Sequence, residues 1–133
     1  MSAVLLNTDV FSFVFKRDTR AKLYERELIG AHACLSFQSV AELQYWANAR
    51  QWGEARRHSL ELTFRRYIVL PYDDAMSQYW ADITASRRSH GKPIACGDAW
   101  IAATALRHGL PLLTHNANDY ADIPGLQVVC RAV

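Results

Sequence analysis

The sequence predicts an α/β domain with three layers, in which a central and mostly parallel β-sheet is flanked by helices. Short apolar runs alternate along the chain with longer segments whose apolar residues recur at helical spacing, and this alternation is typical of parallel sheets. The chain has 133 residues, half of them hydrophobic. That is enough for one ordinary hydrophobic core, so we expect residues 1–133 to form a single domain.

In the first half of the chain, strands are expected where an apolar run is short, and helices where apolar periodicity persists. The two strands expected here cover residues 3–6 and 33–37. Gly30 and Gly53 are expected to end helices, because glycine readily adopts the left-handed conformation that closes a helix. The helices expected here cover residues 9–16, 20–29, 39–52 and 54–66.

The second half of the chain is expected to continue this alternation. Residues 67–71 form a third strand that ends in proline, and residues 91–93 mark a turn between two helices. Those helices are expected over residues 73–90 and 98–108, the second ended by Gly109. The prediction is completed by a fourth strand over 110–114, a loop or single turn over 120–124 and a final edge strand over 126–129.

Composition narrows the class of protein. No apolar run approaches the roughly 20 residues of a membrane span, and the first residues lack the basic segment of a signal peptide. The three cysteines show neither disulfide nor metal spacing, so a reducing cytoplasmic location is expected. The net charge is +2, and 12 of the 15 cationic residues are arginines. Arginine binds phosphate well, although a compositional bias explains this excess equally well.

Acid and amide side chains occur where the predicted strands end and the predicted helices begin. Each has a local structural explanation. Glu42 follows Ser39 by three positions, as in a capping box, while Asp9 and Asp98 are placed to cap helices. The full set consists of Asn7, Asp9, Glu42, Asp98, Asn116 and Asp119.

Taken together, these side chains favour a metal site. In a parallel sheet, the ends of the strands and the starts of the helices that follow them share one edge, so Asn7 is expected to lie near Thr114 and the acids to converge. Converging carboxylates repel one another unless a cation lies between them. Oxygen ligands without paired His or Cys select Mg²⁺ or Mn²⁺. Such a metal activates water and stabilises charge on a phosphate, which favours metal-dependent phosphodiester hydrolysis.

Four segments of the chain, in this order, resemble the PIN domain, and most closely the VapC toxins of bacterial toxin–antitoxin pairs. The resemblance implies a Mg²⁺- or Mn²⁺-dependent endoribonuclease with a central parallel sheet. It also implies a homodimer, a cognate VapB-like antitoxin, and structured RNA, such as tRNA or ribosomal RNA, as substrate. The four segments are LLNTDVFS at 5–12, SVAEL at 39–43, DAWIAATA at 98–105 and LTHNANDY at 113–120.

The resemblance also implies roles for single residues. Position by position, it assigns catalysis and metal binding to Asn7, Glu42, Asp98 and Asp119, with Asp9, Thr114 and Asn116 in support.

The chain departs from the family pattern at Asn7, where the first acid is normally an aspartate. An amide oxygen can still bind a metal, but it brings no charge and is a poor proton acceptor. Three interpretations are open: Asp9 replaces the missing acid, the chain is a naturally weak or inactive member, or the residue was substituted deliberately. The alternative function is therefore a catalytically impaired PIN-fold protein that binds RNA or antitoxin.

Other features are less specific. Paired arginines at 56–57, 65–66 and 87–88 are typical of solvated helix faces, although one or two pairs are expected to contact RNA phosphates. Tyr45 and His115 are candidates to reach a substrate. A hydrolase of another type is not supported, because the sequence contains neither a Gly-x-Ser-x-Gly elbow nor a Gly-rich phosphate loop.

Overall fold

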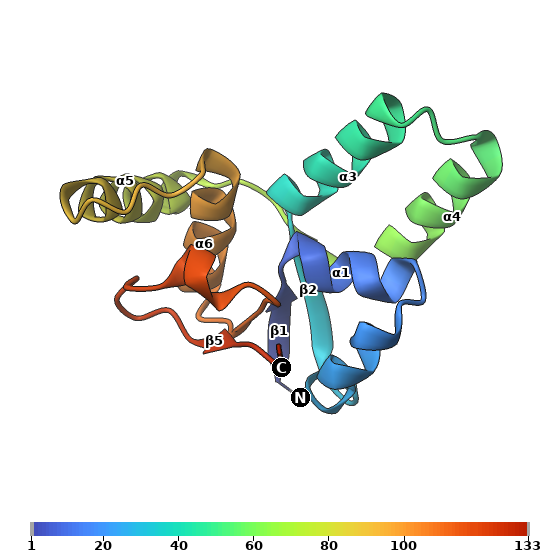
Figure 1. Ribbon diagram of the computed structural model, residues 1–133, viewed down its shortest axis with the longest axis horizontal. Helices are drawn as coiled ribbons and strands as arrows, with labels where there is room; N and C mark the ends of the chain where they lie inside the picture. The colour runs from blue at the N-terminus through green and yellow to red at the C-terminus, as the bar shows by residue number, and fades with distance from the viewer. Residues whose placement is uncertain (1, 133) are drawn as a thin grey trace.

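A computed structural model describes residues 2–132 of the chain and has three layers (Figure 1). Its central sheet has five strands in the order β3-β2-β1-β4-β5, and every neighbouring pair is parallel. The prediction of a mostly parallel sheet flanked by helices is therefore confirmed, with the last strand at an edge. The strands are β1 (Ala3–Leu6), β2 (His32–Ser36), β3 (Ile68–Leu70), β4 (Leu112–Leu113) and β5 (Val128–Val129).

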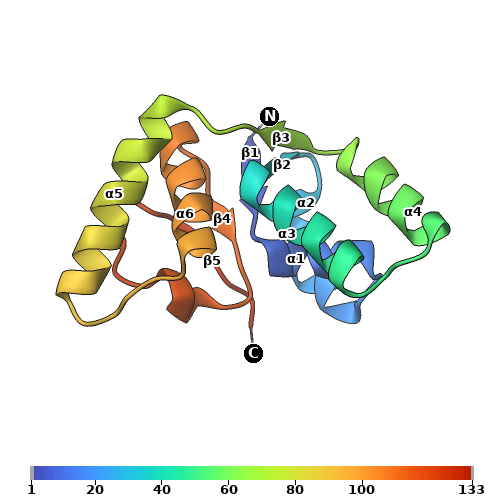
Figure 2. The same ribbon diagram turned by 90° about the horizontal axis from the view of Figure 1, so that it is seen from above.

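Helices cover both faces of the sheet (Figures 1 and 2). On one side lie α1 (Thr8–Phe15), α3 (Phe37–Ala49) and α4 (Glu54–Phe64), and on the other α5 (Asp74–Ser89) and α6 (Cys96–His108). Within residues 2–132, no helix is both long and apolar enough to cross a membrane. The remaining helical elements are the short helix α2 (Glu25–Leu28) and two 3-10 turns, η1 (Thr19–Tyr24) and η2 (Ala117–Tyr120).

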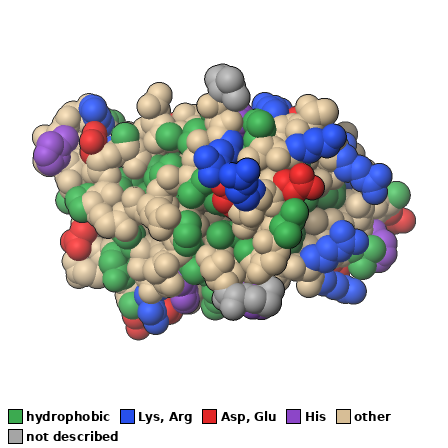
Figure 3. Space-filling model, turned by 90° about the horizontal axis from the view of Figure 1, so that it is seen from below, with side chains coloured by type: hydrophobic (Ala, Val, Ile, Leu, Met, Phe, Trp, Pro, Cys, Tyr) green, Lys and Arg blue, Asp and Glu red, His purple; other side chains and the backbone are tan. Residues whose placement is uncertain are grey.

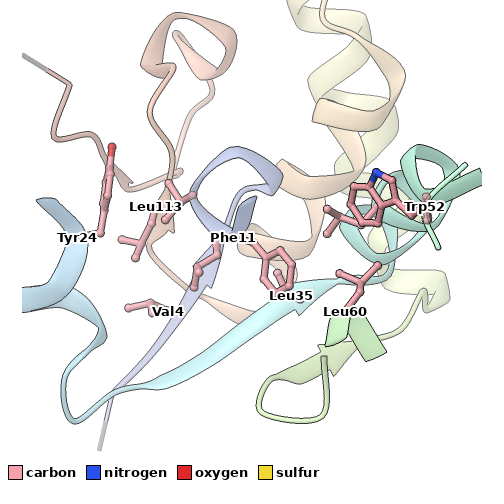
Figure 4. Packing of buried hydrophobic residues seen from close by; sticks show 11 residues of the cluster. Val4, Phe11, Tyr24, Leu35, Trp52, Leu60 and Leu113 are labelled. Carbon is pink, nitrogen blue, oxygen red and sulfur yellow. The ribbon is translucent and has the colours of Figure 1, made fainter. Parts of the chain in front are cut away.

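The core is divided into two clusters by the alternation of side chains along the strands. Val4 and Leu6 face the side of α1, α3 and α4, whereas Leu5 between them faces α5 and α6, as the period of two in a strand requires. Figure 4 shows the first cluster, in which Phe11 lies near Leu35 of the sheet. Because β1 is buried on both faces, its sequence is apolar without interruption.

The start of α3 differs from the expected position. The helix begins at Phe37, two residues early, because the hydroxyl of Ser36 accepts a hydrogen bond from Gln38 N at 3.1 Å and caps it. The predicted capping box of Ser39 and Glu42 is therefore wrong, and both side chains are available for other partners.

The predicted caps of the other two helices are also wrong. The N-cap residue of α1 is Asn7, and that of α6 is Ala95. Asp9 and Asp98 instead lie in the first turns of these helices. Neither residue occupies the N-cap position of its helix.

The single helix expected over residues 20–29 is wrong, because the structure contains the 3-10 turn η1 followed by the four-residue helix α2. The break occurs at Tyr24, whose backbone departs from helical angles. Its side chain is fully buried, and its hydroxyl lies 3.1 Å from Thr114 O and 2.6 Å from His115 Nδ1. The turn expected over 120–124 is also displaced, since η2 occupies residues 117–120.

We expect Phe11→Ala to lower the free energy of unfolding by about 3–5 kcal/mol, because truncation of a buried ring leaves a cavity. The Phe11 ring is fully buried and packs against the rings of Phe64 and Tyr67. Urea denaturation followed by circular dichroism measures the change. Tyr45→Ala, at a side chain that is 67% exposed, is the control and should change stability by less than about 0.5 kcal/mol. A loss below about 1 kcal/mol for Phe11→Ala would place this ring outside the core.

Candidate functional site

The predicted site residues gather at the edge of the sheet where the parallel strands end. The last residues of β1 and β4, Leu6 and Leu113, are paired in register. The residues that follow them, Asn7 and Thr114, are therefore neighbours although 107 positions separate them. Since ligands of open α/β sheets bind at this edge, the structure places these side chains where a site is expected.

Asn7 precedes α1, but its side chain does not cap the helix. The side chain is buried and bridges two other elements. Its Nδ2 donates to Thr114 Oγ1 at 3.1 Å, and its Oδ1 accepts from the Tyr120 hydroxyl at 2.8 Å. The amide is thus held at both ends, and one lone pair of Oδ1 remains for a further ligand.

Glu42 of α3 is oriented by two hydroxyl groups. Thr8 Oγ1 lies 2.5 Å from Glu42 Oε2 and 2.8 Å from Ser39 Oγ. Since Thr8 has a single hydroxyl proton, it donates that proton to the carboxylate and accepts the proton of Ser39. Gly97 lets α6 approach this carboxylate, because a Cβ there would lie 3.2 Å from Glu42 Oε1 and 2.8 Å from Gln38 Nε2.

Asp98 is half-buried in the first turn of α6, with its Oδ1 3.3 Å from the Tyr120 hydroxyl. Burial raises the pKa of Asp98 to about 6. The charges of Asp119, Glu42 and Asp9 also raise this pKa, whereas the hydrogen bond from Tyr120 lowers it. The repulsion between Asp98 and these carboxylates favours a bound cation.

Asp9 is engaged by the backbone on both carboxylate oxygens. It accepts from Val10 N at 2.7 Å and from His115 N at 3.0 Å, and so ties the start of α1 to the end of β4. Burial raises the pKa of Asp9, although these hydrogen bonds partly lower it. The engagement of both oxygens favours a structural role for Asp9 over the replacement of an acid at position 7.

Asp119 lies in η2, and its Oδ2 accepts from Asn116 Nδ2 at 2.9 Å. The next residue, Tyr120, is buried and brings its hydroxyl between Asn7 and Asp98. Sequence reasoning did not single out Tyr120, because its partners are 113 and 22 positions away. No local pattern in the chain indicates such a contact.

The two candidates for substrate contact differ in their surroundings. The ring of His115 is held by the Tyr24 hydroxyl, 2.6 Å from Nδ1, and packs edge to face against Phe13. This packing favours a structural role for the imidazole. Tyr45 of α3 is 67% exposed, so its ring is accessible to a partner.

The paired arginines do not all lie on solvated surfaces. Arg87 is only 7% exposed, so the expectation of a solvated pair at 87–88 is wrong for this residue. Arg56 and Arg57 are both exposed. Arg57 donates to the carbonyls of Trp52 and Ala47, and Arg56 stacks on the ring of Trp52 at 4.1 Å. On the face drawn in Figure 3, Lys and Arg side chains cluster on the half of the molecule that contains α1 and α4.

The chemistry of the donor set at this edge fits a hard divalent cation. All of these donors are oxygen atoms. Within residues 2–132, no Lys, Arg or His forms an ion pair with an acid of this site, so the negative charge is not offset. In the described part of the chain, no three His, Cys, Asp or Glu side chains stand close enough to hold a metal by themselves. The oxygen donors themselves are of the type that Mg²⁺ prefers, since this ion keeps several waters and binds through one or two carboxylates.

The sequence and the fold of this chain are both similar to those of known proteins. The family model of the PIN domain matches residues 4–126. The chain is 32% identical to the VapC ribonuclease Y4jK of Sinorhizobium fredii, with 95% of each chain covered. It is 28% identical to the tRNA(fMet)-specific endonuclease VapC of Shigella flexneri, with 96% of each covered. In a solved structure of VapBC-1 from nontypeable Haemophilus influenzae, one chain superimposes with a TM-score of 0.86 at 26% identity, covering 97% of this chain and 98% of that one.

We expect Asp98→Asn to stabilise the metal-free protein above pH 6 and to have little effect below pH 4. The folded protein holds the Asp98 proton up to a pKa of about 6, against an ordinary value of 3.8. Wild-type stability is therefore lost as the pH rises through this window. The loss is about 1 kcal/mol, since solvent screens a half-buried group.

Thermal unfolding between pH 4 and 8 in the presence of a chelator measures this difference. Asp82→Asn, at an exposed position of α5, is the matched control for the loss of one carboxylate. A constant difference between Asp98→Asn and wild type across this range would refute the electrostatic explanation.

Proposed function

The chain belongs to the PIN-domain family, and within it to the VapC proteins, and we propose that it is a divalent-metal-dependent ribonuclease that acts as the toxin of a toxin–antitoxin pair. The observation that supports this best is the meeting of Asn7, Tyr120 and Asp98 at the end of the sheet, beside acids that form no ion pair within residues 2–132. The raised pKa of Asp98, caused by burial and by the charges of nearby acids, agrees with it. An uncompensated cluster of acids at a ligand-binding edge is suited to Mg²⁺ or Mn²⁺.

The ion would lie among Asp98, Glu42, Asp119 and the neutral amide oxygen of Asn7, with one or two of the carboxylates as direct ligands and waters completing its shell. When bound, such an ion supplies positive charge that acidifies water and stabilises charge on a phosphate. The protein's own contribution is to fix the ligands. Thr8 orients Glu42, Asn116 orients Asp119, and the Tyr120 hydroxyl holds the Asn7 amide.

The hydroxyl of Thr114 is proposed to support the same site. It accepts hydrogen bonds from Asn7 Nδ2 and from Asn116 N, both at 3.1 Å. These bonds hold the two loops after β1 and β4 in a fixed relation. Thr114 therefore orders the ligand cluster, together with Asp9, which joins the same loops through His115 N.

The substrate and partners are proposed from the relatives. One relative is named as a tRNA(fMet)-specific endonuclease, which supports a structured RNA of the tRNA or ribosomal class as substrate. Several similar structures are VapBC complexes, which supports a VapB-like antitoxin as partner of this chain. A homodimer is proposed from the family resemblance alone. The free thiols of Cys34, Cys96 and Cys130 suit a reducing cytoplasm.

A second candidate function follows from Asn7. The residue is fully accommodated as an amide, with a donor for Thr114 and an acceptor for Tyr120. A neutral residue at this place weakens the attraction for a cation. If that loss is decisive, the chain acts by binding RNA or antitoxin without cleaving RNA.

We expect Asn7→Asp to bind Mn²⁺ about tenfold more tightly than the wild-type chain, because charge count among the ligands sets the affinity of oxygen sites. Cleavage of structured RNA should rise in parallel. Isothermal titration with Mn²⁺ and gel assays with tRNA and ribosomal RNA fragments measure the two effects. Asp98→Ala, made in both backgrounds, should abolish binding and cleavage.

The outcomes separate the two functions. Cleavage by wild type that equals cleavage by Asn7→Asp would mean that charge at position 7 is not needed. Cleavage by Asn7→Asp but not by the wild-type chain would mean that the amide at position 7 is what prevents this PIN domain from cleaving RNA. If none of the proteins binds Mn²⁺ or cuts RNA, the ribonuclease proposal fails and the binding function replaces it.

A further inference from the structure

Arg87 is a buried cation to which neither the fold nor the proposed chemistry assigns a role. It lies in the last turn of α5 and is 7% exposed. Within residues 2–132, no carboxylate forms an ion pair with it. A buried charge without a counter-ion is unfavourable unless hydrogen bonds satisfy it, so the partners of this guanidinium indicate why it is there.

All three hydrogen bonds of the Arg87 guanidinium go to backbone carbonyls. Its Nε donates to Lys92 O at 2.7 Å, and its Nη1 donates to Asp119 O at 3.0 Å and Ala121 O at 3.1 Å. The first carbonyl belongs to the turn between α5 and α6. The other two lie on either side of Tyr120, more than 30 positions along the chain.

The segment that Arg87 holds contains two side chains of the site. Asp119 raises the pKa of Asp98 through its charge, and Tyr120 donates to Asn7 Oδ1 at 2.8 Å. Little regular structure restrains this segment, because η2 is a single 3-10 turn. A planar guanidinium that binds several acceptors in a fixed geometry is well suited to immobilise such a turn.

We propose that Arg87 is a positioning residue, which fixes the backbone on both sides of Tyr120 and thereby sets where the Asp119 carboxylate and the Tyr120 hydroxyl lie relative to Asp98. Within residues 2–132, Arg87 bonds the backbone of Asp119 but forms no hydrogen bond or ion pair with an acidic side chain of the site. Its effect on metal binding rests on the proposed function, whereas its effect on the backbone does not. A role in general stability alone would loosen the whole domain and not this segment in particular.

Amide hydrogen exchange of the metal-free protein tests the positional part of the proposal. The amides of Asp119 and Ala121 are bonded within the segment, to Asn116 O and Asn118 O. In Arg87→Met, which removes the charge at similar length, exchange of residues 117–121 should be at least tenfold faster, while exchange of β1 stays unchanged. Arg87→Lys keeps the charge but lacks the planar guanidinium that donates in several fixed directions, so it should give an intermediate exchange rate. It provides the same comparison if Arg87→Met does not fold.

Arg88→Met is the matched control, because Arg88 is the next residue on α5 and is exposed. It should leave exchange of residues 117–121 within twofold of wild type. Unchanged exchange of this segment in the Arg87 variants would overturn the proposal. So would an equal acceleration in β1 and in the segment, since that is the signature of a general loss of stability.

A double-mutant cycle tests the link to the acid. Arg87→Met should weaken Mn²⁺ binding about tenfold in the wild-type background, but less than twofold in the Asp119→Ala background, because Arg87 acts through the segment that contains this ligand. Equal weakening in both backgrounds would overturn the link. If the wild-type protein does not bind Mn²⁺, the proposed function fails, and the exchange experiment alone decides the role of Arg87.

Discussion

The parallel pairing of β1 with β4 is the interaction on which the candidate site depends. Leu5 N donates to Pro111 O at 2.9 Å, and Asn7 N donates to Leu113 O at 2.8 Å. Both strands are buried on both faces, so a shift of one residue would exchange the two faces and misplace every side chain. Burial therefore fixes the register, and the register places Asn7 beside Thr114. The positions of the polar side chains follow from apolar packing.

The architecture and the strand edge could be predicted because each depends on local patterns. Apolar runs and helical periodicity indicate the elements, and Gly109, with a positive φ of 64°, ends α6 as expected. The details of the site depend on contacts that no local pattern contains. The sequence pattern indicates Ser39 as the cap of α3, whereas in the structure Ser36 at the end of β2 caps this helix and Ser39 turns to Thr8. Arg87 belongs to a polar helix end, so its burial could not be foreseen.

The amide at position 7 determines the direction of the hydrogen bonds around it. Because Nδ2 of Asn7 donates, the Thr114 hydroxyl is an acceptor here, and its own proton points towards Asp9 Oδ2 at 3.5 Å. A carboxylate at position 7 could only accept, so Thr114 would have to donate to it and would lose the contact with Asp9. It would also add a charge to a cluster that already raises the pKa of Asp98. The amide thus stabilises the metal-free site and lowers its attraction for a cation.

The Tyr120 hydroxyl links the protonation of Asp98 to the amide at position 7, because it lies within hydrogen-bonding distance of both residues. Burial raises the pKa of Tyr120, so its hydroxyl keeps its single proton, which it donates to Asn7 Oδ1 at 2.8 Å. Asp98 Oδ1 lies 3.3 Å from the same hydroxyl and can accept this proton only in place of Asn7 Oδ1. An ionised Asp98 competes with Asn7 for one proton and faces the other acids without compensation. A cation bound by the carboxylates would replace that proton, so occupancy of the site and ionisation of Asp98 are expected to rise together.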